Sequence, residues 1–138
     1  MQKIIILGSS GFIGGNLFKH FLSDRGYDIK GFSSQEFEKQ IEEGNQKGHP
    51  LSLYFHLPFC EERCTFCGCS IVATKKHEVA IPYLESLKKE IESVAKLTDS
   101  SRKVEQFHWG GGTPTYLSLE QSDRLVKATR EYFDFTDD

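Results

Sequence analysis

The stretch that decides the fold is LSLYFHLPFCEERCTFCGC, residues 51–69. Its first seven residues partly alternate between apolar and polar side chains, which predicts a strand over 51–57. The strand runs into a loop that holds every cysteine of the chain: Cys60, Cys64, Cys67 and Cys69. A disulfide framework in a secreted domain usually spreads its cysteines along the chain. This crowding therefore indicates a metal ion or cluster in a reducing compartment.

The spacing Cys60-x-x-x-Cys64-x-x-Cys67 places three thiolates on one short loop, close enough to bind three irons of a cubane cluster. The fourth iron then stays open, so a substrate can bind it and receive an electron directly. The alternatives are a zinc site, a redox disulfide pair or a coincidental grouping of cysteines. Zinc sites usually pair two short Cys or His units, and the sequence has no second pair beyond the loop. Cys69 falls outside the spacing and is interpreted as a spare buried thiol, a group beside the site, or a catalytic group.

Outward from this loop, the sequence predicts alternating helices and strands. Apolar residues at helical spacing predict an amphipathic helix over 82–97. A strand is predicted over 104–109, and it ends on a run of glycines, 110–112. Ser118 and Gln121 match a capping box, which predicts the start of a final helix. The repeated order of strand, loop and helix predicts an α/β fold with parallel strands.

Two motifs in this part of the chain resemble one family of enzymes. The first motif is Tyr54-x-His56-x-Pro58-Phe59-Cys60-x-x-x-Cys64-x-Phe66-Cys67-Gly68-Cys69. The second is Phe107-His108-Trp109-Gly110-Gly111-Gly112-Thr113-Pro114-Thr115-Tyr116-Leu117. Together they resemble the oxygen-independent coproporphyrinogen III oxidases of the radical S-adenosylmethionine (SAM) superfamily. The resemblance covers 37–138 and implies an incomplete β/α barrel, of which this chain holds the first two β/α units.

The resemblance also implies a chemistry. The implied ligands of a 4Fe–4S cluster are Cys60, Cys64 and Cys67, and SAM binds the open iron. One electron cleaves SAM to methionine and a 5′-deoxyadenosyl radical, which starts the oxidative decarboxylation of coproporphyrinogen III to protoporphyrinogen IX in porphyrin biosynthesis. The family pattern assigns contacts with SAM to five residues: Tyr54, Phe66, Gly111, Gly112 and Thr113. Cys69 is implied to be a non-ligating cysteine that activity requires.

The beginning of the chain resembles a different family. Residues 3–7 predict a strand that leads into Gly8-x-x-Gly11-x-x-Gly14 at the start of a helix, and a second strand is predicted over 27–32. This β-α-β pattern resembles the extended short-chain dehydrogenases, which include NAD-dependent epimerases and dehydratases. The resemblance implies NAD(P) bound at Gly8, Gly11 and Gly14, with its pyrophosphate at the helix N-terminus. A β-α-β unit that only packs is the alternative, because no acidic residue ends the second strand.

The two parts of the chain resemble unrelated families, so the sequence predicts a join between Gly31 and Phe37. We therefore expect two parts, a Rossmann-like segment over 1–36 and the N-terminal part of a radical SAM barrel over 37–138. A short helix is expected over 35–43, and the polar, glycine-containing segment 44–50 is expected to end it. The function predicted for such a chain is binding of a cluster, and of SAM weakly, without turnover of coproporphyrinogen. An NAD(P)-binding epimerase or dehydratase fragment is the alternative function.

Composition and charge limit the kinds of binding partner that the sequence predicts. The chain has 20 acidic and 17 basic residues, a formal net charge of −3, and no long block of either sign. These values give no electrostatic reason to expect nucleic acid or an anionic membrane as a partner. The apolar run 4–7 is too short for a membrane span or a secretory signal, so a cytoplasmic location is expected. The partners implied by the family are coproporphyrinogen III and an electron donor.

Overall fold

The computed structural model describes residues 3–7, 34–68 and 71–136. Three parallel strands form the main sheet in the order β1-β2-β5. Their bounds are Lys3–Leu7 for β1, Leu51–Leu57 for β2 and Val104–Gly111 for β5. The alternating residues Leu51, Leu53 and Phe55 of the central strand are fully buried, which explains why this segment forms the middle of the sheet.

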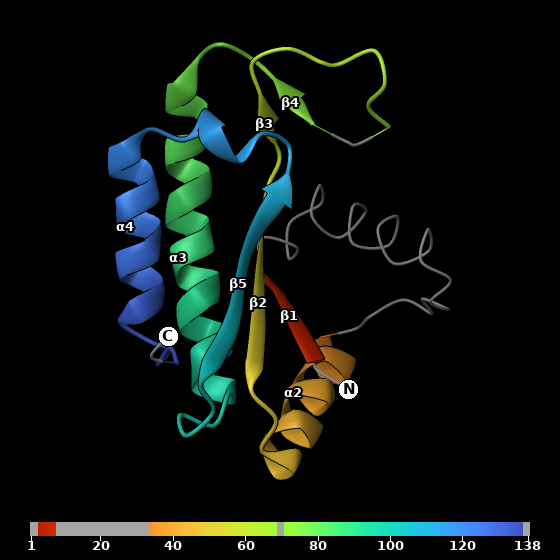
Figure 1. The fold of residues 1–138 in the computed structure, drawn as a ribbon, viewed down its shortest axis with the longest axis vertical. Helices are drawn as coiled ribbons and strands as arrows, with labels where there is room; N and C mark the ends of the chain where they lie inside the picture. Colours follow the sequence, from red (N-terminus) through yellow and green to blue (C-terminus); the bar gives the residue numbers. More distant parts are fainter. Residues whose placement is uncertain (1–2, 8–33, 69–70, 137–138) are drawn as a thin grey trace.

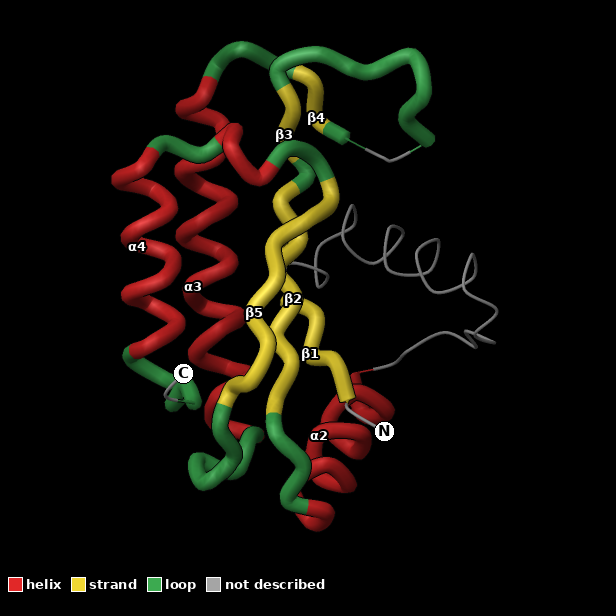
Figure 2. Tube along the Cα trace, viewed as in Figure 1, coloured by secondary structure: helices red, strands yellow, loops and turns green. Residues whose placement is uncertain are grey.

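Within the described residues, three α-helices accompany the sheet: α2 is Ser34–Lys47, α3 is Ala80–Leu97 and α4 is Leu119–Arg130. Helices α3 and α4 lie side by side on one side of the sheet, as Figure 1 and Figure 2 show. Leu87, Ile91 and Val94 form the buried face of α3 and join the β2 side chains in one hydrophobic core. None of the described helices is long and apolar enough to cross a lipid bilayer.

Short elements gather where β2 and β5 end. Strands β3 (Phe59–Cys60) and β4 (Val72–Ala73) pair in parallel, and 3-10 helices cover His77–Val79 and Pro114–Tyr116. The cysteine loop, 61–68, lies beside them beyond the carboxyl end of β2 (Figure 1). In parallel β/α folds this end of the sheet is where functional sites are built.

Much of the predicted pattern is confirmed. The α/β fold with parallel strands is observed, with strands over 3–7 and 51–57 as expected. The capping box is also present: Gln121 N donates to Ser118 Oγ over 3.1 Å, and Ser118 N donates to Gln121 Oε1 over 2.9 Å. Strand β5 runs two residues further than predicted, because Gly110 and Gly111 continue the parallel pairing with β2.

The predicted end of the helix over 35–43 is wrong. Helix α2 continues through Gly44 to Lys47. Gly44 packs against the guanidinium group of Arg102, and a Cβ atom there would lie 3.1 Å from Arg102 Nη1. The helix ends before Gly48, whose φ of 60° lies in the left-handed region that favours glycine after a helix. A tertiary contact, rather than helix termination, therefore accounts for Gly44.

The N-terminal strand belongs to the same sheet as the other strands. Lys3 pairs with Leu51 and Leu7 pairs with Phe55, so β1 lies along β2. The helix and second strand predicted for a Rossmann-like unit fall within 8–33, outside the described residues. The division of the chain at residue 36 therefore stays a prediction.

A buried arginine joins the end of α2 to the turn before β5. Arg102 is only 5% exposed. Its Nε donates to His49 O over 2.7 Å, and its Nη1 donates to Asn45 Oδ1 over 2.8 Å. Asn45 Nδ2 in turn donates to Leu97 O over 2.8 Å, at the end of α3. These hydrogen bonds hold the C-terminal ends of α2 and α3 together and fix them to the segment that leads into β2.

Replacing Arg102 by methionine is expected to lower the free energy of unfolding by about 2–3 kcal/mol, since it removes two charged hydrogen bonds and leaves the partly buried His49 carbonyl oxygen without this donor. Urea denaturation of the purified chain measures this loss. The neighbouring exposed Lys103→Met is the matched control and should change the free energy of unfolding by less than about 0.5 kcal/mol. Equal denaturation midpoints for the two variants would contradict this account of Arg102.

Candidate functional site

Cys60 is the most deeply buried of the three described cysteines. It ends β3 and is buried, and its sulfur accepts a hydrogen bond from Thr113 Oγ1 over 3.2 Å. Thr74 N donates to Cys60 O over 2.8 Å, and Thr113 N donates to Phe59 O over the same distance. Cys60 is therefore held by two segments that lie far from it in the sequence, one after β4 and one after β5.

Cys64 and Cys67 lie on the more open part of the loop. Cys64 is exposed and Cys67 is partly buried, and a turn joins them in which Cys67 N donates to Cys64 O over 3.1 Å. Within the described residues, no three Cys, His, Asp or Glu side chains are close enough together to bind a metal ion. The assignment of Cys60, Cys64 and Cys67 as ligands stays a prediction, as does the role of Cys69, which lies outside the described residues.

The chemistry of the donors fits the predicted cluster. The three described cysteines are free thiols, and thiolates are soft ligands that suit Fe–S clusters and zinc. One thiol is buried at the end of β3, while the other two lie on a turn outside the sheet. Phe66, between the latter two, exposes its whole side chain. A bound group beside the loop would cover this apolar surface.

The first two glycines of the run 110–112 pack against side chains of β2. A Cβ atom on Gly110 would lie 2.6 Å from the Tyr54 hydroxyl oxygen. A Cβ atom on Gly111 would lie 2.7 Å from His56 Nδ1, and the φ of Gly111 is 107°. Distances below 3.0 Å are shorter than real Cβ contacts. The missing side chains therefore let β5 lie close to Tyr54 and His56.

The third glycine packs against backbone. A Cβ atom on Gly112 would lie 2.8 Å from Phe59 N and would overlap the backbone of that residue. Gly112 N donates to Leu57 O over 2.7 Å. This close approach brings Thr113, the next residue, to hydrogen-bonding distance of Cys60. In the described structure the glycine run allows two protein segments to lie close together.

His56 lies against Gly111, where β5 packs on β2. Burial lowers the pKa of His56, which favours the neutral imidazole. The Tyr83 hydroxyl donates to the His56 carbonyl oxygen. Burial raises the pKa of Tyr83, and the charges of Glu90 and Tyr54 raise it further, so the hydroxyl keeps its proton. The Nε2 atom of His56 is buried and has no hydrogen-bond partner among the described residues, so a polar group bound there would satisfy it.

The five residues predicted to contact SAM do not all lie together. Tyr54 lies against Gly110, beside Gly111 and Gly112, while Thr113 reaches Cys60. Phe66 is separate, on the exposed cysteine loop. The structure thus gathers four of the five around the carboxyl end of β5, and their contacts with SAM stay a prediction. Gly8, Gly11 and Gly14, predicted to bind NAD(P), lie outside the described residues.

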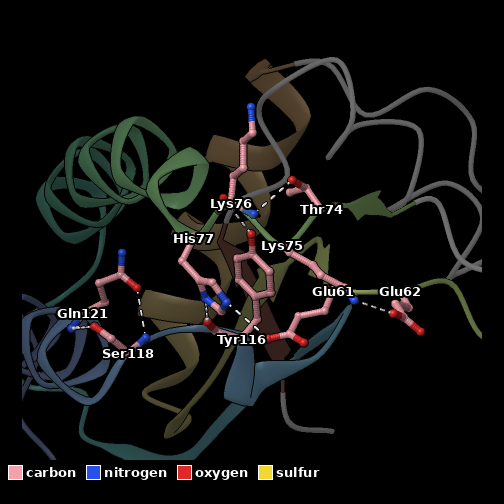
Figure 3. A network of polar contacts seen from close by, with 9 residues as sticks. All are labelled: Glu61, Glu62, Thr74, Lys75, Lys76, His77, Tyr116, Ser118 and Gln121. Atoms are coloured by element: carbon pink, nitrogen blue, oxygen red, sulfur yellow. Dashed lines mark hydrogen bonds and ion pairs between the residues drawn. The ribbon is translucent and has the colours of Figure 1, made fainter.

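Sequence reasoning missed a group of residues beside Cys60, which Figure 3 shows from close by. The His77 ring stacks on the Tyr116 ring, with centroids 4.4 Å apart. Its Nδ1 lies 2.8 Å from Tyr116 O and its Nε2 lies 3.2 Å from Glu61 Oε1. No motif could have identified His77, because its partners are 16 and 39 residues away in the sequence.

Comparison with known proteins identifies the superfamily of the chain. The sequence model of the radical SAM superfamily matches residues 54–136. The oxygen-independent coproporphyrinogen III oxidase of Synechocystis sp. is 46% identical over 104 residues, which cover 75% of this chain and 22% of that protein. The enzyme of that name in Escherichia coli is 51% identical over 89 residues, 64% of this chain and 19% of that protein. The chain thus spans about a fifth of the length of these curated relatives.

A solved structure gives the same result. The coproporphyrinogen III oxidase of Escherichia coli, described as a radical SAM enzyme, superposes with a TM-score of 0.69 and 45% sequence identity. The match covers 76% of this chain and 24% of that protein. An oxygen-independent coproporphyrinogen III oxidase of Mannheimia haemolytica is 52% identical over 64% of this chain and 60% of its own length. None of these relatives is an epimerase or a dehydratase, so they lend no support to an NAD(P) site.

Proposed function

Because the chain belongs to the radical SAM superfamily, we propose that it forms the cluster-binding and SAM-binding part of an oxygen-independent coproporphyrinogen III oxidase. The observation that carries this proposal is the hydrogen bond from Thr113 Oγ1 to Cys60 Sγ. It joins the glycine motif to the cysteine motif at the carboxyl end of the sheet. The relatives that bear the same enzyme name support the choice among radical SAM reactions.

The ligands we propose for a 4Fe–4S cluster are Cys60, Cys64 and Cys67. Such a cluster, when bound, supplies the electron that cleaves SAM and so starts the radical reaction. Cys60 fixes one corner of the site, because its sulfur and both neighbouring peptide groups are already hydrogen-bonded by segments outside the loop. Closure of the turn at Cys64 and Cys67 would complete the ligand set and exclude water from it.

We propose that five residues contact SAM: Tyr54, Phe66, Gly111, Gly112 and Thr113. The glycine run packs against β2 and Phe59, and so brings Gly111, Gly112 and Thr113 to the part of the chain that holds Cys60. The exposed Phe66 ring lies on the loop that carries two of the proposed cluster ligands, and covering it would add apolar contact area. Cys69 is proposed as a non-ligating cysteine that the complete enzyme requires. An electron donor and coproporphyrinogen III are the proposed partners of that enzyme.

Binding of SAM to the purified chain tests the proposal. The 138-residue chain, reconstituted with iron and sulfide without oxygen, is expected to retain radiolabelled SAM in equilibrium dialysis, and the metal-free chain is expected to retain about tenfold less. With coproporphyrinogen III and a reductant added, we expect no vinyl product from this chain. Equal retention of SAM with and without iron would contradict a site built on the cluster.

A further inference from the structure

We propose that His77 is a positioning residue that holds Cys60 in place for cluster assembly. The His77 bridge is the set of contacts that His77 makes with Tyr116 and Glu61. The proposal rests on the proposed function only because it takes Cys60 to be a cluster ligand. The bridge itself is visible in the described chain, as the dashed lines around His77 in Figure 3 show.

The first half of the bridge reaches the residue before Cys60. The His77 ring stacks on the Tyr116 ring with an interplanar angle of 15°, and the Tyr116 ring stacks on the Phe59 ring at 19° with centroids 5.4 Å apart. The Tyr83 ring also meets the Phe59 ring in an edge contact, with centroids 5.2 Å apart. The three stacked rings therefore fix Phe59, and with it the direction in which the chain enters Cys60.

The second half reaches the residue after Cys60. His77 Nε2 lies 3.2 Å from Glu61 Oε1, and the two groups form an ion pair when both ring nitrogens carry protons. The two side chains are 45% and 58% exposed, so this contact alone would stabilise little. It acts together with the hydrogen bond from His77 Nδ1 to Tyr116 O, over 2.8 Å. Because a carbonyl oxygen can only accept, Nδ1 carries a proton and donates.

Tyr116 is itself held in place on the opposite side. Its hydroxyl donates to Lys76 O over 3.0 Å, and burial raises the pKa of Tyr116, so the hydroxyl keeps its proton. Tyr116 N donates to Thr113 O over 2.9 Å, and Thr113 is the residue whose hydroxyl reaches Cys60. The bridge thus connects the residues on both sides of Cys60 to the same segment that donates to its sulfur.

Trypsin cleavage of the metal-free chain at Arg63 tests the bridge without any cluster. Arg63 is exposed on the cysteine loop, and cleavage there follows the fraction of time that the loop is open. His77→Phe keeps a ring on Tyr116 but removes both ring nitrogens. We expect it to raise cleavage at Arg63 about three- to tenfold relative to cleavage at the distant, exposed Lys103.

Variants at Glu61 separate a hydrogen-bonded bridge from a general loss of structure. Glu61→Gln supplies an amide that can donate to Nε2, so its cleavage ratio should stay within about twofold of that of the unchanged chain. Glu61→Ala should behave like His77→Phe. The control is Lys75→Gln, which breaks the exposed Lys75–Glu62 ion pair of 2.8 Å between the same two segments and should have no measurable effect.

Iron release from the reconstituted chain connects the bridge to the cluster. With a chelator in excess, His77→Phe and Glu61→Ala should lose iron about three- to tenfold faster than the unchanged chain, and Glu61→Gln should restore the slower rate. An unchanged Arg63 cleavage ratio in His77→Phe, or equal effects of Glu61→Gln and Glu61→Ala, would overturn the proposal. If neither the unchanged chain nor any variant binds iron, the proposed function fails. The cleavage ratios then still test the His77 bridge.

Discussion

Replacing Cys60 by serine is expected to reduce the iron retained after anaerobic reconstitution from about four atoms per chain to well under one. A serine hydroxyl stays protonated near neutral pH and is a hard oxygen donor, so it replaces a thiolate poorly on a cluster iron. The substitution should leave the fold intact, because the serine oxygen can still accept the hydrogen bond that Thr113 donates to Cys60 Sγ. Iron and sulfide analysis of the desalted protein measures the loss.

The matched control for this experiment is Cys69→Ser. Cys69 lies outside the three-cysteine spacing and is proposed to be non-ligating, so this variant should retain iron as well as the unchanged chain does. Circular dichroism should show the same helix content in both variants. Full iron content in Cys60→Ser, or an equal loss in Cys69→Ser, would contradict the assignment of ligands.

The second large effect is expected at Gly112. An alanine there is expected to lower the free energy of unfolding by about 3 kcal/mol and the melting temperature by about 10 °C. The reason is steric: a Cβ atom on Gly112 would overlap the backbone of Phe59, which cannot turn aside as a side chain can. Moving β5 away would also break the hydrogen bond from Gly112 N to Leu57 O.

Two other glycines calibrate this prediction. Apart from its chain neighbours, no described residue has an atom within 4 Å of a Cβ position on Gly68, so Gly68→Ala should leave the melting temperature within about 2 °C of its original value. Gly110→Ala meets the Tyr54 side chain, so its effect should fall between the other two. Thermal unfolding followed by circular dichroism ranks the three variants. A Gly112→Ala variant as stable as Gly68→Ala would show that the close contact with Phe59 does not constrain the fold.

Local signals were sufficient for the elements and for the two motifs. The alternation over 51–57 and the capping box at Ser118 depend on neighbouring residues, and the structure confirms both. The cysteine spacing is equally local, and together with the glycine motif it carries the resemblance to the superfamily that the comparison confirms. Such patterns depend on contacts within a few residues, so they can be identified before the chain is folded.

Long-range contacts explain what the sequence could not predict. The helix end predicted at Gly44 was wrong. Gly44 instead packs against Arg102, which lies far from it in the sequence. The packing of the glycine run on Tyr54, His56 and Phe59 depends on the register between β2 and β5, which no local pattern specifies. The contacts of His77 arise in the same way, from segments that meet only in the folded chain.

The central claim is that the cysteine loop holds a cluster with one iron open to SAM. The most direct test is electron paramagnetic resonance of the anaerobically reconstituted, dithionite-reduced chain, recorded with and without SAM. We predict a reduced 4Fe–4S signal whose g values shift when SAM is added, since SAM would become a ligand of the open iron. A cluster signal that SAM leaves unchanged, or zinc bound in place of iron, would contradict the claim.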